Sequence, residues 1–214
     1  MEVLALADSV IRAFQAGGGF MYAILGVMII SIAIMVERFI YISVKNRIDE
    51  TAFVNKIIEL LQKGAVSNAI ELCRMSRAAL PQITRAGLEE YGKSPAEIQN
   101  AFELAAMSEI PKLEKRTQYL SMFANVATLL GLLGTIFGLI DSFQAVASAD
   151  ASQKATLLSA GISVAMNTTA FGLIAAIPAL IGYSYIQEKT NELIDSINEN
   201  VARIYRRMAS AQKA

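Results

Sequence analysis

Three long apolar stretches set the pattern of this chain. Residues 13–36, 117–140 and 155–187 contain no charged side chain. An α-helix needs about 20 apolar residues to cross the hydrocarbon core of a bilayer, and each stretch is longer than that. The pattern predicts an all-α integral membrane protein with three transmembrane helices.

Outside these stretches, apolar residues also recur at helical spacing. Residues 49–64 place apolar side chains every three or four positions, which is typical of an amphipathic helix. Ser94 and Glu97 have the spacing of a capping box, with Pro95 at the first helical position. Residues 187–207 continue the third apolar stretch with the same periodicity. We expect a helical cytoplasmic domain, and long second and third helices that extend into the cytoplasm.

The N-terminal residues mix charged and apolar positions in a way that suits a short helix lying at the outer membrane interface. Gly17, Gly18 and Gly19 then form a break before the first span. In chain order, the predicted segments are an outer-side interfacial amphipathic helix (1–16), transmembrane helix 1 (17–44), a cytoplasmic helical loop (45–116), transmembrane helix 2 (117–147), an outer-side link (148–154), transmembrane helix 3 (155–187) and a cytoplasmic C-terminal helix (188–214).

The distribution of cations predicts the orientation of these helices. Residues 45–116 contain eleven Lys or Arg, and residues 188–214 contain five. The N-terminal segment holds only Arg12, and the link between the second and third spans holds only Lys154. Because Lys and Arg resist translocation, we expect the N-terminus on the periplasmic side and the C-terminus in the cytoplasm of a bacterial inner membrane.

Overall charge and composition exclude several classes of site. The 19 Lys and Arg balance the 19 Asp and Glu, which gives no indication of a nucleic-acid partner. The chain has no His and one Cys, Cys73, so a zinc, haem or iron–sulfur site is not expected, nor is any other cofactor. Cys73 is interpreted as a buried structural thiol. The sequence has no phosphate-binding loop lysine, nucleophile–base pair or inverted repeat, so an enzyme or a lone transporter ranks last.

Small residues follow one face of each of the last two spans. A row of this kind lets another backbone approach closely, and close packing is what joins helices in lipid. We therefore expect the two helices to pack together, within one subunit or between subunits. The glycines assigned to this packing are Gly131, Gly134 and Gly138 in the second span, and Gly161 and Gly172 in the third.

Polar side chains stand inside the same two spans. Asn167 carries an amide that needs hydrogen-bond partners in hydrocarbon, so it is expected to face protein or water. The hydroxyls of Thr135, Thr168 and Thr169 can instead bond a carbonyl of their own helix, so each is open to a structural or a functional interpretation. Together with Ser159 and Ser163, the polar side chains Asn167, Thr168 and Thr169 suggest a polar, hydrated path through the interior of the helix bundle, which Thr135 would also line.

Other features of the spans refine this hypothesis. Pro178 removes a backbone donor and predicts a kink in the third helix. Glu37 and Arg38 lie at the inner interface, where anchoring is favoured over a specific role. The cores of the spans hold no titratable side chain, and Asp141 lies toward the outer end of the second. Any carboxylate that carries an ion is therefore expected to come from another polypeptide.

The motifs resemble those of the MotA/TolQ/ExbB proton channel family, and most closely its ExbB/TolQ branch. The matching stretches are "ERF" at 37–39, "GLLGTIFGLIDSF" at 131–143 and "NTTAFGLIAAIPAL" at 167–180, and the resemblance covers essentially the whole chain. It differs at one position, because Val164 stands where ExbB and TolQ proteins usually have a glutamate.

The resemblance implies a proton-driven motor subunit. It implies a homopentamer around a dimer of single-span ExbD/TolR-like partners, whose aspartates carry the protons, and work delivered to a TonB/TolA-like or gliding-machinery partner. Thr135 and Thr169 match the pore-facing threonines of the family. Val164 leaves the envelope process open, so TonB-dependent import, Tol-type envelope maintenance and gliding motility all remain candidates. The alternative is a passive membrane scaffold with no ion path.

Overall fold

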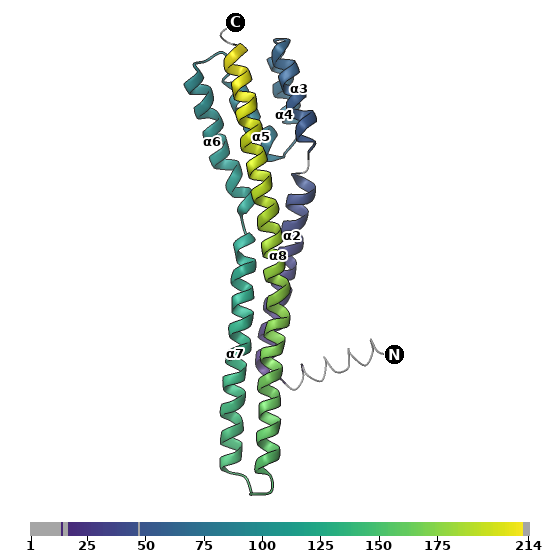
Figure 1. The fold of residues 1–214 in the computed structure, drawn as a ribbon, viewed down its shortest axis with the longest axis vertical. Helices are drawn as coiled ribbons and strands as arrows, with labels where there is room; N and C mark the ends of the chain where they lie inside the picture. Colours follow the sequence, from purple (N-terminus) through teal and green to yellow (C-terminus); the bar gives the residue numbers. More distant parts are fainter. Residues whose placement is uncertain (1–13, 15–16, 47, 212–214) are drawn as a thin grey trace, which may run out of the picture. The chain divides into compact units, whose positions relative to one another are not determined.

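The computed structural model describes residue 14 and residues 17–46 and 48–211, and the regular elements in this part of the chain are all helical (Figure 1). Contacts divide the chain into two units, one formed by residues 17–36 and 116–184 and the other by residues 37–115 and 185–211. The elements are α2 (Gly19–Ile40), the π-helical turn η1 (Tyr41–Lys45), α3 (Glu50–Gln62), α4 (Val66–Arg74), α5 (Ala79–Glu89), α6 (Pro95–Glu114), α7 (Thr117–Ala147) and α8 (Lys154–Ala211).

The all-helical fold predicted from the sequence is confirmed. Three helical segments are long and apolar enough to cross a membrane, and they correspond to the three predicted spans. The amphipathic helix expected over residues 1–16 lies outside the described residues except for Phe14. The predicted segment boundaries and the cytoplasmic placement of the helical extensions stay predictions.

The first unit is a small-residue helix bundle. Ile24 of α2 is fully buried against Ala124 and Ala127 of α7 and against Ala175 and Ala179 of α8. Larger apolar side chains point outward, as expected where lipid replaces water around a protein. Those on α7 and α8 include Leu129, Leu132, Phe143, Met166, Ile174 and Ile177.

The second unit has a larger apolar core, to which the C-terminal part of α8 contributes. Ile197, Ile204 and Met208 of α8 are at most 1% exposed and join one cluster with residues of α3, α4, α5 and α6. The amphipathic continuation predicted for the third helix is therefore confirmed as a helix with one buried face. The capping box at Ser94 and Glu97 is also confirmed, because each side chain bonds the other residue's backbone N–H.

The second long helix differs from the sequence-based expectation. The pattern predicts a helix that runs from the helical loop directly into the span, but α6 ends at Glu114 and α7 begins at Thr117. Arg116 has a φ of 68°, a left-handed conformation that interrupts the helical path. By contrast, α8 remains helical through Pro178, which lies inside it.

Candidate functional site

The contact between α7 and α8 contains the residues singled out in the sequence. The two helices run side by side in opposite directions within the first unit (Figure 1). A Cβ added at Gly134 would lie 3.0 Å from the Cβ of Thr168, and one added at Gly138 would lie 3.4 Å from the Cα of Ala165. The glycine row of α7 therefore packs directly on the small-residue face of α8.

The closest backbone approach is at Gly131 and Gly172. A Cβ at Gly172 would lie 2.8 Å from the carbonyl oxygen of Ala127 and 3.0 Å from the Cα of Gly131. Backbone atoms cannot move aside as a flexible side chain can, so only glycine fits here. The sequence leaves open whether these helices pack within one subunit or between subunits. The structure brings them together within one chain.

Thr135 and Thr169 meet across this contact. The Thr135 hydroxyl lies 3.0 Å from the carbonyl oxygen of Gly131 in its own helix and 3.0 Å from that of Ala165 in α8. The Thr169 hydroxyl donates to the Gly131 carbonyl at 3.3 Å, and the two hydroxyls contact each other. The two hydroxyl protons thus have more acceptor atoms within reach than they can bond at the same time.

This arrangement has a reciprocal geometry. Gly131 is four residues before Thr135, and Ala165 is four residues before Thr169. Each threonine hydroxyl reaches across to the carbonyl one turn before the other threonine, so Thr135 reaches Ala165 and Thr169 reaches Gly131. Both side chains are only partly buried. Each hydroxyl oxygen keeps acceptor capacity while it donates to a carbonyl. The pair can therefore accept a hydrogen bond from a group outside the two helices.

Thr168 has a different environment from its neighbour. It is 1% exposed, and its hydroxyl donates to the Ala165 carbonyl at 2.8 Å. Its Cβ and Cγ2 fill the space beside Gly134. Its place in the contact is that of a packing residue, enclosed between the helices.

Asn167 stands on another side of α8. Residues two positions apart on an α-helix are separated by about 200° around its axis, so Asn167 and Thr169 cannot line the same narrow face. The Asn167 side chain is partly buried and makes no hydrogen bond to any residue that the structure describes. The structure therefore brings together Thr135 and Thr169, encloses Thr168, and separates Asn167 from the pair.

No Asp, Glu, Lys, Arg or His shares the stretches of α7 and α8 that hold the threonine pair. The parts of α7 and α8 that contain it, residues 117–140 and 155–187, carry no charged side chain. Asp141 is exposed on α7. Among the described residues, no group of three or more His, Cys, Asp or Glu side chains could hold a metal ion. The pair can donate and accept hydrogen bonds, but it cannot itself take up or release a proton at neutral pH.

At the other end of α2, Arg38 has more specific contacts than a surface anchor. It is 3% exposed, and its guanidinium donates to the Leu113 carbonyl in the last turn of α6. It also lies over the Tyr41 ring, 4.9 Å from the ring centroid. A cation at a helix C-terminus satisfies a free carbonyl and complements the helix dipole. Glu37 is exposed.

Sequence reasoning misses one participant in the helix contact. The sequence pattern assigns Ser142 no part in the helix contact, but Ser142 is 5% exposed and donates to the Gly138 carbonyl at 2.7 Å. A side chain at Gly161 would overlap it. The signal that could have found it is its helical spacing of four from Gly138, which places it on the glycine face.

Comparison with known proteins assigns the chain to a family. The profile of the MotA/TolQ/ExbB proton channel family matches residues 75–199, more than half of the chain. The chain belongs to this family. The matched range contains the glycine row of α7, the threonine pair and the small-residue face of α8.

Individual relatives agree with the profile. The chain is 27% identical over 191 residues to a putative biopolymer transport protein named ExbB-like 3 from Synechocystis sp., covering 84% of this chain and 90% of that protein. It is 38% identical over 95 residues to the Tol-Pal system protein TolQ of Haemophilus influenzae, covering 44% of this chain and 40% of that protein.

A solved structure has the same fold. The C. jejuni MotAB structure aligns with a TM-score of 0.62 and 15% identity, over 96% of this chain and 87% of that one. With its three apolar helices, this chain is a membrane subunit of the proton-channel type. The family is one of channel and motor subunits and not an enzyme class.

Proposed function

We propose that this chain is the ring-forming subunit of a motor driven by the proton-motive force. In this proposal, an ExbD/TolR-like single-span partner supplies the acidic side chain that this chain lacks in the cores of its own spans. The observation that carries the proposal is the Thr135–Thr169 pair, two partly buried hydroxyls in charge-free stretches of α7 and α8. Membership of a proton channel family supports it.

The hydroxyls can serve a partner carboxyl group in both of its protonation states. Beside a protonated carboxyl, one of the two hydroxyls accepts its hydrogen bond while Thr135 and Thr169 donate to the Ala165 and Gly131 carbonyls. Beside an ionised carboxylate, a hydroxyl rotates and donates to it instead. Apolar surroundings favour the neutral acid, so the carboxyl ionises where these hydroxyls reach it.

The energies involved are of similar size. A membrane potential contributes about 2.3 kcal/mol per charge per 100 mV. Interhelical hydrogen bonds in membranes are worth about 0.6 to 2 kcal/mol each. A single proton transfer can therefore bias the exchange of one or two such bonds, which is what a stepwise motor requires.

The remaining parts of the proposal follow from the family and from the charge pattern. The assembly is a homopentamer around a partner dimer, in a bacterial inner membrane, with the N-terminus periplasmic and the C-terminus cytoplasmic. A TonB/TolA-like or gliding-machinery protein receives the work. In this proposal Asn167 and Thr168, which the sequence also placed on the path, take no direct part in it, because Thr168 is enclosed between the helices and Asn167 lies on another side of α8. Val164 takes no part in proton transfer, because it has no acidic group.

A passive scaffold is the second candidate, and one observation favours it. Every hydroxyl of the pair already has a backbone carbonyl acceptor, so both threonines can act purely as links between helices. This function predicts that valine variants, which keep the packing but lack the hydroxyls, assemble and work nearly normally.

The test replaces each hydroxyl by a methyl group of similar size. The complex that co-purifies with a tagged copy of this chain is reconstituted in proteoliposomes, and proton flux is followed with an internal pH dye. For Thr135→Val and Thr169→Val, we expect normal assembly and at least about tenfold less flux, because a bond worth about 1.4 kcal/mol corresponds to a tenfold change in rate.

Two further variants make the result decisive. Thr135→Ser restores a hydroxyl and is expected to recover the flux. Thr128→Val is the matched control, because Thr128 lies on α7 and, among the described residues, its hydroxyl bonds only the Ala124 carbonyl of its own helix, at 3.1 Å. Full flux in both valine variants of the pair would support the scaffold and reject the motor. The absence of any co-purifying chain with an acidic residue in a single span would also reject it.

A further inference from the structure

The loop between α4 and α5 presents the most exposed large apolar side chain among the described residues. Met75 is 82% exposed, although Cys73, two positions earlier, is fully buried in the core of the second unit. The loop is ordered by two hydrogen bonds to Ser76. The Ala78 N–H donates to its hydroxyl at 3.2 Å, and the Gln82 side chain donates to its carbonyl at 2.7 Å. Met75 is therefore held at the surface by a defined loop conformation.

Arginines flank Met75 on both sides. Arg74 and Arg77 are exposed. Arg74 lies 3.9 Å from Glu89, and an ion pair between two such exposed side chains contributes little. Arg77 makes no hydrogen bond or ion pair with any residue that the structure describes. The loop thus combines an apolar side chain with one loosely paired cation and one unpaired cation.

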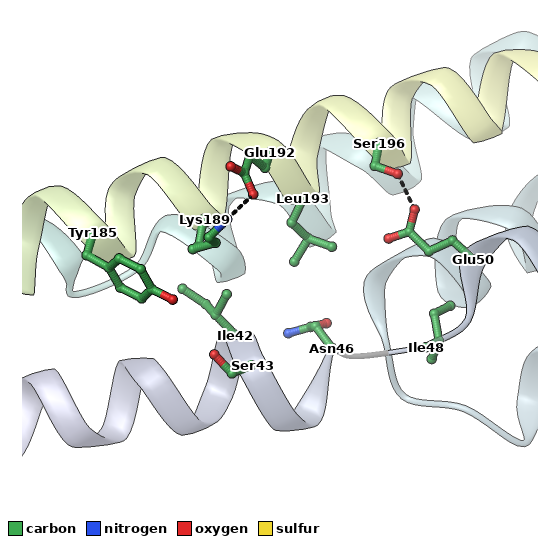
Figure 2. Close-up of a pocket in the computed structure, with 10 residues that line it drawn as sticks. All are labelled: Ile42, Ser43, Asn46, Ile48, Glu50, Tyr185, Lys189, Glu192, Leu193 and Ser196. Carbon is green, nitrogen blue, oxygen red and sulfur yellow. Dashed lines mark hydrogen bonds and ion pairs between the residues drawn. The ribbon is translucent and has the colours of Figure 1, made fainter.

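A hydrogen bond attaches this loop to the end of the first helix. Figure 2 shows Asn46 where the chain leaves η1. The buried Asn46 side chain accepts from the Ala79 N–H, the first residue of α5, at 3.3 Å and donates to the Tyr41 carbonyl at 3.3 Å. Short connections reverse the chain after α3 and again after α4, as antiparallel neighbouring helices require. The loop therefore lies at the η1 end of these helices.

Two helices place the end of the hydrocarbon core at the same level. A core about 30 Å thick takes about 20 helical residues, and α2 begins at Gly19, so the core ends near Phe39. Tyr185 of α8 stacks on Phe39 with the ring centroids 6.3 Å apart, and tyrosines gather at the membrane interface. The charge-free part of α8 ends two residues later, at Gln187.

The loop lies within electrostatic reach of the lipid headgroups. Asn46 follows Phe39 by seven residues, which is about 10 Å of helix. Headgroups occupy about 5 to 8 Å beyond the core, and the attraction of an anionic leaflet extends about one Debye length further, about 8 to 10 Å. Arg77 is two residues from Ala79, at most about 8 Å along the chain. Its long side chain can therefore meet the leaflet surface.

We propose that the α4–α5 loop docks on the anionic phospholipid surface of the leaflet beside the second unit. Arg74 and Arg77 lie against the phosphates, and Met75 lies among the headgroups. Lys45 and Arg47, on either side of Asn46 in the sequence, add to the positive charge next to the span. The docked loop gives the second unit an attachment to the membrane besides the spans themselves. This proposal requires a membrane protein but does not depend on the motor function.

The experiment measures lipid contact at the loop of the full chain in nanodiscs. An apolar fluorophore on Met75→Cys replaces the methionine, and the buried Cys73 stays unlabelled. Lipids with a nitroxide on the headgroup quench a docked loop. We expect the ratio of docked to free loops to be at least about tenfold higher in phosphatidylglycerol than in phosphatidylcholine, the effect of two cations near an anionic surface. The difference should vanish in 1 M salt, where the Debye length is about 3 Å.

Matched variants assign the contact to this loop. Arg77→Gln in the labelled chain should lower the ratio about fivefold in phosphatidylglycerol, since one cation is lost. Arg206→Gln makes the same charge change at an exposed position near the end of α8 and should leave the ratio unchanged. Gln62→Cys carries the label at the exposed far end of α3, twelve residues or about 18 Å from its start, and should not be quenched.

Three outcomes would overturn the proposal. The first is equal quenching of the Met75→Cys label in the two lipids, and the second is equal quenching of the labels at positions 75 and 62. The third is rapid disulfide formation between copies of unlabelled Met75→Cys, which would show that a second copy covers the loop. Each result leaves the motor proposal untouched, because the proton-flux assay with Thr135 and Thr169 reads a different part of the chain.

Discussion

At the scale of single residues, the α7–α8 contact depends on glycines, which have no side chain, and on threonine hydroxyls that form hydrogen bonds between the helices. Gly131 and Gly172 bring two backbones so close that a Cβ on Gly172 would lie 3.0 Å from the Cα of Gly131, which leaves no room for alanine. Thr135 and Thr169 then bridge helices that already touch. Packing sets the distance between the helices, and the hydroxyls give the contact its polarity.

Replacement of Gly172 tests the contribution of packing. In Gly172→Ala the new methyl group meets the Ala127 carbonyl at 2.8 Å, so the helices must separate. We expect a loss of about 1 to 3 kcal/mol, the usual cost of overpacking, seen as a lower thermal unfolding midpoint in detergent. Gly26→Ala is the control, because nothing lies within 4 Å of its added Cβ and alanine favours a helix. Equal midpoints for both variants would contradict this account of the contact.

The buried thiol gives a prediction about pH. Burial raises the pKa of Cys73 from its ordinary value of 9.0 to about 12, in line with its full burial in the second unit. Between these pH values the unfolded chain releases a proton that the folded chain retains, so stability falls as the pH rises above 9 and is unaffected below it.

Chemical labelling and unfolding measure this effect. At pH 8 we expect native Cys73 to react with a maleimide at least about 100-fold more slowly than the denatured chain, since the thiolate is the reactive form. In Cys73→Ala the fall in stability between pH 9 and about 11 should be smaller. Rapid labelling of the native protein would show that the thiol is accessible and would contradict its structural interpretation.

At the scale of elements, capping contacts determine where helices of the second unit start and stop. Asp49 caps α3 by accepting from the Ala52 N–H at 2.9 Å, and Ser94 caps α6 through its capping box. Arg38 bonds the last turn of α6, just before Arg116 interrupts the helical path. The Arg38 contact and the left-handed Arg116 mark the break between α6 and α7, although both sequences favour helix throughout.

Loss of one cap should loosen one helix end without unfolding the domain. Ser94→Ala removes the acceptor of the Glu97 N–H, which costs about 1 kcal/mol at a helix N-terminus. We expect faster amide hydrogen exchange over residues 95–99 and little change at the far end of α6. Ser108→Ala on the exposed face of the same helix is the control. Unchanged exchange at residues 95–99 would mean that the cap does not hold this end.

At the scale of the whole molecule, α8 supplies a face to both units. Its N-terminal part packs small residues on α7, and its C-terminal part buries Ile197, Ile204 and Met208 in the core of the second unit. The two units are stabilised by different interactions. The first depends on close packing of small residues in lipid, and the second buries larger side chains away from water.

This division predicts that the units respond separately to a core mutation. Ile204→Ala leaves a cavity in the second unit, at a cost of about 2 to 5 kcal/mol. We expect faster hydrogen exchange throughout residues 50–110, with exchange over residues 120–145 unchanged. Ile177→Ala, at a position that is 53% exposed in the first unit, serves as the matched control. Equal acceleration of both regions would show that the two units unfold together.

Several features were determined by the sequence alone, because they depend on neighbours close along the chain. Charge-free runs longer than a bilayer is thick predict the three spans. Periodicity over residues 187–207 predicts the buried face of α8, and the Ser94 box predicts the start of α6. The glycine face and the family motifs are also evident without coordinates, since helical spacing places them.

The environment of each polar side chain was decided only by the tertiary structure. Asn167, Thr168 and Thr169 are adjacent in sequence, yet one has no described partner, one is enclosed and one meets Thr135. The burial of Arg38 against α6 depends on a residue 75 positions away. Periodicity states which residues share a face, but the partner of that face is fixed by packing between distant segments, which no local pattern encodes.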